Sequence, residues 1–307
     1  MTARTSTDGP HRVALEPGHP FSSLVRVDLS ARSHTGHHRP NNEDHFLVTR
    51  IGRTLETVIT SLPAGDVPAR SEEDNYVMIV ADGMGGHAAG EIASRMAISA
   101  LISLALDVPD WILKVDEDHA REIKRRSRKR FQRIGAMLVE RGRRDPALSG
   151  MGTTLTVARS LGRDLLIAHV GDSRAYLLRA GGLHRLTRDH TYAQLLVDTG
   201  RLAPEDVADS RHRHVLTNAL GGSSEDVRVD TDLLRLNDGD RLLLCSDGLT
   251  DLVDDGTITS ILRNATRSSD ACERLVQRAL DRGGRDNVTV IVAAYRLPEE
   301  PARTKAG

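Results

Sequence analysis

Two stretches of this sequence constrain its fold most, because each is an unbroken apolar run that stops at an Asp-Gly pair. The first is YVMIVADG, which reaches Asp82, and the second is RLLLCSDG, which reaches Asp247. Short apolar runs without the alternation of a half-exposed strand are typical of strands that are covered on both faces. The fold must therefore supply a packing layer on each side of these strands.

Further carboxylates stand where other predicted strands begin, end or turn. Glu43 and Asp44 open the strand in NNEDHFLV, Asp286 precedes the last strand in RDNVTVIV, and Asp172 lies at a tight corner in HVGDSRAYLL. A single Asp beside Gly is usually a turn. Several such acids on one rim would repel each other unless a cation neutralised them. Carboxylate oxygens suit Mg²⁺ or Mn²⁺, and two such ions about 3.5–4 Å apart can clamp a phosphate.

The glycines after Asp82 allow another interpretation. Gly83-x-Gly85-x-x-Ala88 fits the fingerprint of a dinucleotide-binding loop between a strand and a helix. Against it, a pyrophosphate would lie beside the negative charge of Asp82, and no second parallel strand with an acidic end follows. The sequence also contains no G-x-x-x-x-G-K-[ST] motif, which excludes a P-loop.

Composition narrows the function classes. The 307 residues carry a net charge of −1, so no overall field favours nucleic acid or a membrane surface. The only cysteines, Cys245 and Cys272, lack the spacing of a metal knuckle or a redox pair. The sequence has no signal-peptide core and no run of ~20 apolar residues. We therefore expect a cytoplasmic protein with neither a membrane nor a nucleic-acid partner.

One segment is strongly basic, although the whole chain is nearly neutral. Residues 121–144 hold 11 Lys and Arg against 2 acidic residues. A solvated outer helix face is the simpler interpretation, and a docking surface for an acidic partner or nucleic acid is the alternative.

Periodicity predicts helices and strands in separate blocks. A polar insertion rich in His is expected at 200–220. Helices are expected from about 92 to 107, 115 to 142, 191 to 199, 257 to 264 and 270 to 281, with strands at 23–29 and 76–81, a loop at 61–74, an antiparallel meander from 152 and a last strand at NVTVIVAAY.

Six motifs occur in the order seen in a known family. The motifs are Arg39-x-x-Asn42-Glu43-Asp44, Asp82-Gly83-Met84-Gly85-Gly86, Met151-Gly152-Thr153-Thr154, Gly171-Asp172-Ser173-Arg174, Ser246-Asp247-Gly248 and Asp286-Asn287. On these motifs the chain resembles the PP2C (PPM) family of metal-dependent protein Ser/Thr phosphatases, bacterial branch, from about residue 22 to 297.

The resemblance implies an α+β fold, a four-layer α-β-β-α sandwich of two antiparallel sheets flanked by helix pairs. It implies a phosphatase domain over 22–297, with a flap at about 190–222 near the active site. Residues 1–20 are expected to be a flexible N-terminal tail and 298–307 a C-terminal tail.

The resemblance also implies the roles of individual residues. Asp82 would bridge two Mn²⁺ or Mg²⁺ ions, with the Gly83 carbonyl on one of them. Asp247 and Asp286 would complete the first metal, and Asp172 would support a third, weaker ion. Glu43 and Asp44 would hold metal-bound waters, and Arg39 would grip the substrate phosphate.

The implied reaction is direct attack of a metal-bridged water on phosphoserine or phosphothreonine in proteins, opposing protein kinases in signalling. Met84 stands where many eukaryotic members carry a proposed general-acid His, so leaving-group protonation has no assigned side chain. His87 is expected to be a helix-entry residue, and Arg174 a structural partner of a carboxylate or carbonyl. His212 and His214 are expected to be solvated loop residues, with a substrate role as the alternative.

Two other functions remain open at this stage. A pseudoenzyme that only binds phosphoproteins is one, although its hallmark would be the loss of metal carboxylates. A sibling phosphatase acting on a sensor, an anti-sigma antagonist or a small phosphorylated molecule is the other.

Overall fold

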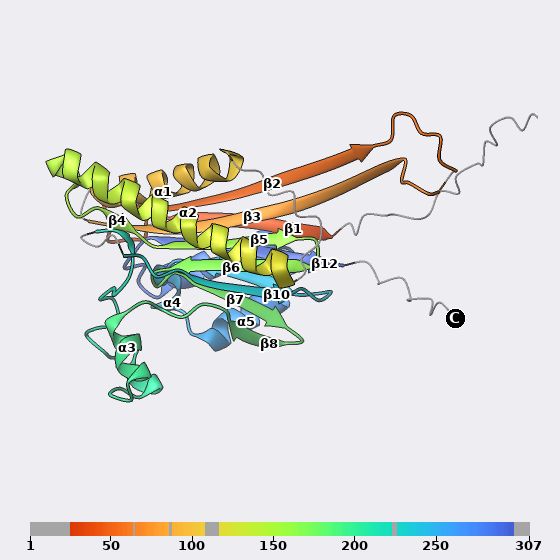
Figure 1. Cartoon of the computed structure of the whole chain (residues 1–307). Coiled ribbons are helices and arrows are strands. Elements are labelled where there is room, and N and C mark those ends of the chain that lie inside the picture. Colours follow the sequence, from red (N-terminus) through yellow and green to blue (C-terminus); the bar gives the residue numbers. More distant parts are fainter. Residues whose placement is uncertain (1–24, 64, 86–87, 108–116, 223–225, 298–307) are drawn as a thin grey trace, which may run out of the picture.

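A computed structural model describes residues 25–63, 65–85, 88–107, 117–222 and 226–297. Two antiparallel sheets pack together, and helices cover their outer faces, which confirms the predicted fold class (Figure 1). The first sheet has the strand order β1-β12-β11-β7-β8: Arg26–His34, Val288–Arg296, Arg241–Cys245, Arg174–Arg179 and Gly182–Arg185.

The second sheet has the order β10-β6-β5-β3-β4-β9, and β2 pairs with the other edge of β3. Its strands are Asp230–Arg235, Asp164–Val170, Leu155–Leu161, Arg70–Met84, Gly152–Thr153 and Leu220–Gly221, with β2 at Asp44–Glu56. The helices are α1 Ala88–Asp107, α2 Glu117–Arg144, α3 Tyr192–Asp198, α4 Asp247–Thr250, α5 Asp255–Asn264 and α6 Ser268–Asp281, with 3₁₀ turns η1 Pro146–Leu148 and η2 Pro204–Asp206.

Both unbroken apolar runs are strands that are buried on both faces. In β3, Ile79 packs into the cluster beneath α1 and α2, whereas Met78 and Val80 pack between the two sheets. In β11, Leu243 packs toward α5 and α6, whereas Leu244 packs between the sheets. Successive side chains of a strand point to opposite faces. An apolar residue is therefore needed at every position of the two runs, Val77–Ala81 and Leu242–Cys245.

Helix α1 has the length and composition of a membrane span, but it belongs to this core. Among the described residues it alone passes that test, over Ala89–Leu106 with a mean hydropathy of 1.4. Ala93, Ala97 and Leu101 are buried in the cluster with the second sheet. Core helices of soluble proteins have the same composition.

Several predicted boundaries were wrong. The first strand runs from Arg26 to His34, rather than over 23–29, and the predicted loop at 61–74 already contains the start of β3 at Arg70. Strands β4, β9 and β10 were not foreseen. The five predicted helices are all present, within a few residues of the expected ends.

The predicted meander is also wrong in one respect, because its strands belong to two different sheets. Hairpin β5-β6 lies in the second sheet and hairpin β7-β8 in the first. The chain crosses between the sheets at residues 171–173, directly at the corner that carries Asp172. The crossing places that carboxylate between the ends of both sheets.

The packing of α2 gives a first prediction. Phe131 is 1% exposed in the cluster between α2 and the second sheet. We expect Phe131→Ala to lower the free energy of unfolding by about 3–5 kcal/mol, because it removes buried surface and leaves a cavity. The neighbouring Gln132 is exposed, so Gln132→Ala should change it by less than about 0.5 kcal/mol. Equal effects in chemical denaturation would contradict this placement of the helix.

Candidate active site

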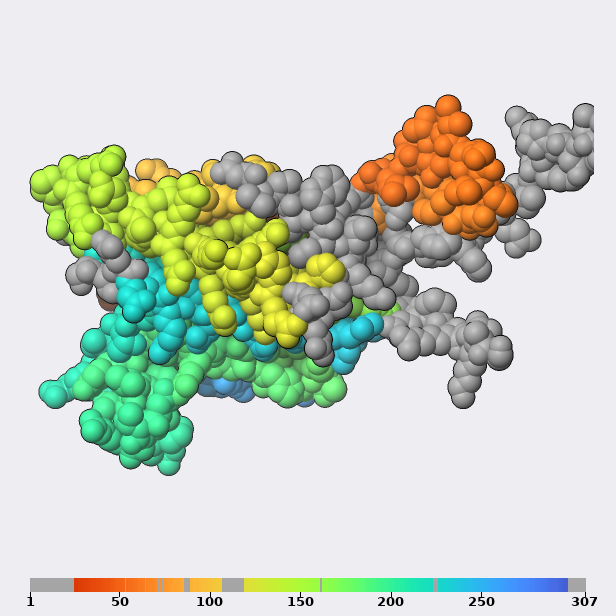
Figure 2. All heavy atoms as spheres, viewed as in Figure 1, coloured from red at the N-terminus to blue at the C-terminus, as the bar shows by residue number. Residues whose placement is uncertain are grey.

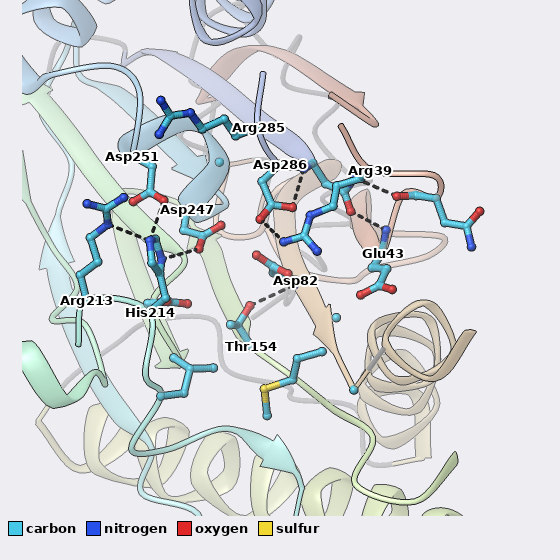
Figure 3. A pocket seen from close by; sticks show the side chains of 18 of the residues that line it. Arg39, Glu43, Asp82, Thr154, Arg213, His214, Asp247, Asp251, Arg285 and Asp286 are labelled. Atoms are coloured by element: carbon cyan, nitrogen blue, oxygen red, sulfur yellow. Dashed lines mark hydrogen bonds and ion pairs between the residues drawn. The ribbon is translucent and has the colours of Figure 1, made fainter. Parts of the chain in front are cut away.

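A cavity of about 870 Å³ opens where the strand ends of both sheets meet (Figure 3). Asp82, Asp172, Asp247 and Asp286 all line it, together with Glu43 and Arg39. These residues come from segments that are as much as 247 positions apart in the chain. Of the site residues predicted from the sequence, Asp44 alone is not on the cavity wall, and it lies directly behind Asp82.

Asp82 is held in place by its own backbone. Its carbonyl oxygen accepts hydrogen bonds from Thr153 Oγ1 at 2.8 Å and from the Thr154 N–H at 2.9 Å. Its N–H donates to Thr154 Oγ1 at 2.9 Å. The Met-Gly-Thr-Thr motif therefore fixes the end of β3, which leaves the Asp82 carboxylate free to face the cavity.

Asp44 lies opposite Asp82 in the β2-β3 ladder, so two carboxylates face each other across neighbouring strands. Like charges in this position are unfavourable. Ser246 Oγ donates to Asp44 Oδ2 at 2.7 Å, whereas Asp44 Oδ1 is buried with no hydrogen-bond partner in the described structure. Burial raises the pKa of Asp44 to about 7, despite the hydrogen bond from Ser246. An orphaned, buried carboxylate oxygen calls for a water molecule or an ion.

Asp172 follows a glycine that no other residue can replace without strain. Gly171 has φ of +109°, and a Cβ there would lie 2.5 Å from Thr154 Cγ2. Positive φ is available to Gly at little cost. The sharp corner at Gly171 turns the buried Asp172 toward the cavity.

Asn287 fastens the loop that carries Arg39 and Glu43. Its Nδ2 donates to the carbonyl oxygens of Thr35 and Asn41, and its Oδ1 accepts the N–H of Glu43 at 2.7 Å. The adjacent Asp286 accepts a hydrogen bond from Arg39 Nη2 at 2.6 Å. One Asp-Asn pair thus positions the guanidinium at the cavity rim (Figure 3).

The glycines after Asp82 allow close packing of three segments. A Cβ on Gly83 would lie 2.1 Å from the Gly90 carbonyl oxygen and 2.9 Å from that of Glu43. A Cβ on Gly90 would lie 2.4 Å from Glu43 Oε2. The glycines therefore bring β3, the start of α1 and the Glu43 loop into contact.

The acids of the cavity oppose one another electrostatically. Burial raises the pKa of Asp82 well above its ordinary value, and the negative charges of Asp44, Asp247, Asp172 and Asp286 raise it further. The pKa of Asp172 is also raised, first by burial and then by Asp247. Bound cations would reverse both effects, because they favour ionised carboxylates. The donor set, all carboxylate and carbonyl oxygen apart from one imidazole, fits Mg²⁺ or Mn²⁺.

His214 and Asp251 are cavity residues that the sequence analysis missed. His214 Nδ1 lies 3.6 Å from Asp247 Oδ2, and Nε2 lies 3.3 Å from Asp251 Oδ2. The neighbouring Asp247 carboxylate raises the pKa of His214, and burial raises that of Asp251 to about 6. His214 is an exposed loop residue, as predicted, and it also lies beside two carboxylates of the cavity. The spacing of Asp247 and Asp251 on one short helical turn was the only available signal.

Other predictions have mixed outcomes. Arg174 is a structural partner of a carboxylate, as predicted: its Nε and Nη2 both donate to Asp189. His212 lies away from the cavity wall, in edge contact with the ring of Tyr192. His87 lies outside the described residues.

Residues 190–222, the segment predicted to be a flap, project from the two sheets, and Arg213, His214 and Leu216 of this segment line the cavity (Figure 1). His190 fastens its two ends. The His190 N–H donates to the Gly171 carbonyl oxygen, the His190 carbonyl accepts the Thr217 N–H, and its Nδ1 accepts hydrogen bonds from the Gly171 N–H and Asn218 Nδ2. Because Nδ1 is an acceptor, Nε2 carries the proton and donates to Asp230 Oδ2 at 3.0 Å. One buried ring therefore ties the flap to the corner before Asp172.

Comparison with known proteins agrees with this geometry. A family model for protein phosphatase 2C matches residues 60–283. The chain belongs to the protein phosphatase 2C family. Serine/threonine protein phosphatase PstP of Mycobacterium tuberculosis is 42% identical over 233 residues, which are 75% of this chain. The chain spans 43% of the length of PstP.

Two further comparisons cover nearly the whole length of the matched chain. Protein phosphatase PhpP of Streptococcus pneumoniae is 34% identical over 279 residues, which cover 90% of this chain and 100% of PhpP. The crystal structure of the PstP catalytic domain in complex with two manganese ions is 36% identical, with a TM-score of 0.69. The match covers 89% of this chain and 100% of that one.

Because the carboxylates around Asp82 repel one another, a variant that lacks one of them should be more stable than wild type when no metal is bound. In a chelating buffer, Asp82→Asn should raise the melting temperature by roughly 2–4 °C, equivalent to ~1 kcal/mol, because it removes one of several opposing charges. Asp209 is exposed, and Asp209→Asn should leave the melting temperature unchanged. A lower melting temperature for Asp82→Asn would contradict the account of the cluster.

The same repulsion gives a pH dependence. When folding raises the pKa of a carboxyl group, ionisation of that group at high pH lowers the free energy of unfolding. Protonation at low pH removes this loss. The pKa of Asp44, which faces Asp82 across the β2-β3 ladder, is raised to about 7. The stability gap between Asp82→Asn and wild type should therefore be widest near pH 8 and close as the pH falls to about 4. Melting curves across this range, recorded in chelator, measure it; a gap that widened in acid would refute the sign.

The anchoring of the flap by His190 can be tested by proteolysis. His190→Ala leaves several buried polar groups unpaired, at a cost of about 1–3 kcal/mol each. We expect trypsin to cut faster at Arg201 and Arg211 within the flap. His190→Asn keeps an acceptor near the Nδ1 position and should restore part of the protection. Identical digestion of all three proteins would show that His190 does not hold the flap.

Proposed function

We propose that this protein is a metal-dependent protein serine/threonine phosphatase that hydrolyses phosphoserine and phosphothreonine. The observation that carries the proposal is the convergence of Asp82, Asp172, Asp247 and Asp286 on one cavity that also holds the Arg39 guanidinium. Such a set of acids is stable only if cations neutralise it. The named functions of PstP and PhpP, and the two manganese ions of the PstP structure, support the same reaction.

The residues of this chain fit two divalent ions and a third, weaker one. In the proposal the Asp82, Asp247 and Asp286 carboxylates and the Gly83 carbonyl would hold the two ions. Glu43 and Asp44 hold the waters of the ions, which gives the orphaned Asp44 Oδ1 a partner. Asp172 holds the third ion. When bound, such ions lower the pKa of a water molecule and neutralise charge on the phosphoryl group.

The chain itself binds and orients the phosphate. Arg39 can place two parallel N–H groups on phosphate oxygens, because a guanidinium is planar and remains charged. Asp286 holds Arg39 at the rim through the 2.6 Å contact and prevents it from folding away. His214 and Leu216 form the wall on the flap side, so the flap lies beside any substrate in the cavity.

The proposal also covers the bounds of the phosphatase domain, its role in the cell and its location. The phosphatase domain spans residues 22–297, and its reaction opposes protein kinases. Both cysteines are free and buried in the described structure, which suits a reducing, cytoplasmic location. A binding-only pseudoenzyme is disfavoured, because every carboxylate matched to the family motifs is present.

Metal dependence is the direct test. Hydrolysis of an aryl phosphate and of a phosphothreonine peptide should require Mn²⁺ or Mg²⁺ and disappear in chelator. Asp82→Asn and Asp247→Asn should lower kcat/KM by at least about 100-fold, the upper range for residues that only support metal ligands. Asp209→Asn is the matched control and should retain full activity.

Arg39→Ala should act differently from the acid variants. It should raise KM for both substrates while metal binding, measured by calorimetry, remains intact. Wild-type protein that binds metal yet hydrolyses neither substrate would overturn the proposal in favour of a binding module. Activity that survives chelation would overturn the metal mechanism alone.

A further inference from the structure

The outer face of α2 is the most strongly charged surface that the proposed reaction does not use. The helix carries 11 Lys and Arg against 4 Asp and Glu, whereas the rest of the chain carries 31 against 39. The near-zero net charge of the protein thus conceals a separation of charge. Figure 2 shows α2, in yellow to lime, along an open face of the molecule.

Four exposed side chains form what we call the basic ridge: Arg125, Arg128, Lys129 and Arg133. At 3.6 residues per turn they fall within about 140° of one another, opposite the buried Phe131 and Ile134. Arg125 is paired with Glu122. Within the described structure, Arg128, Lys129 and Arg133 have no acidic side chain within ion-pair distance.

Local helix stability does not explain this ridge. Arg125 and Lys129, and likewise Lys129 and Arg133, are like-charged pairs four residues apart, which destabilise a helix. Other parts of α2 follow the opposite rule, since Arg144 pairs with Glu140 and Arg126 with Glu122. Charges retained against local stability point to a role in binding.

The ridge is connected to the cavity through three adjacent strands. A Cβ on Gly135 of α2 would lie 3.8 Å from Leu220 Cδ2, so the helix packs closely on β9. Strand β9 pairs with β4, and β4 pairs with Gly83 and Met84 at the end of β3. One helix-to-sheet layer and two strand spacings give a path of roughly 20 Å from α2 to Gly83.

The partner can be narrowed by chemistry. Base stacking with a single-stranded nucleic acid would need exposed aromatic side chains, but Phe131, the only aromatic residue of α2 other than His119, is 1% exposed. A membrane-surface helix would turn an apolar face to lipid, yet the apolar face of α2 is packed in the core. An acidic polypeptide needs only the exposed cations.

We propose that the basic ridge docks an acidic segment of the phosphoprotein substrate, a proposal that rests on the phosphatase function. The ridge spans about 12 Å from Arg125 to Arg133, which matches about four extended residues. Its centre lies a further ~9 Å along the helix from Gly135, so the path to Gly83 is roughly 30 Å. The acidic segment therefore lies about ten residues from the phosphorylated residue.

The test compares phosphothreonine peptides that differ only in a tail. One carries four Glu after a Gly-Ser linker of about ten residues, one carries four Gln after the same linker, and one carries four Glu directly beside the phosphothreonine. For the wild-type enzyme with Mn²⁺, KM should be about tenfold lower for the first peptide than for the other two, equivalent to ~1.4 kcal/mol. The kcat should be unchanged, and high salt should remove the difference. The tail is placed on either side of the phosphothreonine in separate peptides.

Two matched variants locate the effect. The ridge variant is Arg128→Glu with Lys129→Glu and Arg133→Glu. The control is Arg263→Glu with Arg267→Glu and Arg278→Glu, three exposed cations on or beside α5 and α6 of the other layer. The ridge variant should lose the tenfold preference, the control should keep it, and both should hydrolyse an aryl phosphate at the wild-type rate.

Each outcome decides between the claims. Equal KM values for all peptides in wild type, or equal losses in both variants, would overturn the docking proposal. Ridge-dependent binding to vesicles rich in phosphatidylserine or to single-stranded RNA, without binding to a Glu-tailed peptide, would overturn it too. Fluorescence anisotropy of an unphosphorylated Glu-tailed peptide measures docking without turnover. Absent aryl phosphate hydrolysis would then refute the phosphatase function independently.

Discussion

The main constraint on this structure is the mutual repulsion of the carboxylates that the two sheets bring together. Asp82 and Asp44 face each other across the β2-β3 ladder, and Asp172, Asp247 and Asp286 arrive from the other strand ends. Burial and neighbouring negative charges raise the pKa of Asp82. Without cations, the ionised carboxylates therefore destabilise the folded state. A protein keeps such a cost only where function requires it. The remaining features of the cavity can be understood as means of holding these acids in place.

The cavity acids are held in place mostly by hydrogen bonds to the backbone of the segments that carry them. Thr153 and Thr154 bind the peptide groups of Asp82, Asn287 binds the loop of Glu43, and His190 binds the corner before Asp172. None of these contacts uses a cavity carboxylate, which leaves the acids available for ligands. Such supporting residues fix the positions of the acids but take no part in the reaction themselves.

The sequence alone singled out Asp82 and Asp247 because each ends an unbroken apolar run, a pattern that burial on both faces requires, and Asp286 because it stands just before the last strand. It could not predict that β6 and β7 lie in different sheets, because Gly171 permits the corner in either case and long-range packing decides it. The contact of His214 with the cavity acids could not be predicted for a similar reason. His214 sits in a polar stretch without periodicity, and only the return of the flap through Thr217 and Asn218 brings it to Asp247. The charge counts of α2 were visible, but the lack of acidic partners around Arg128 was not.

The central claim is that the carboxylates around Asp82 form a site for divalent cations. Anomalous diffraction from crystals soaked in Mn²⁺ tests it most directly, because manganese is located without reference to activity. The account predicts two strong peaks beside Asp82, one of them also beside Asp247 and Asp286, and neither in crystals of Asp82→Asn. Crystals that bind manganese only elsewhere, or an unchanged pair of peaks in the variant, would contradict it.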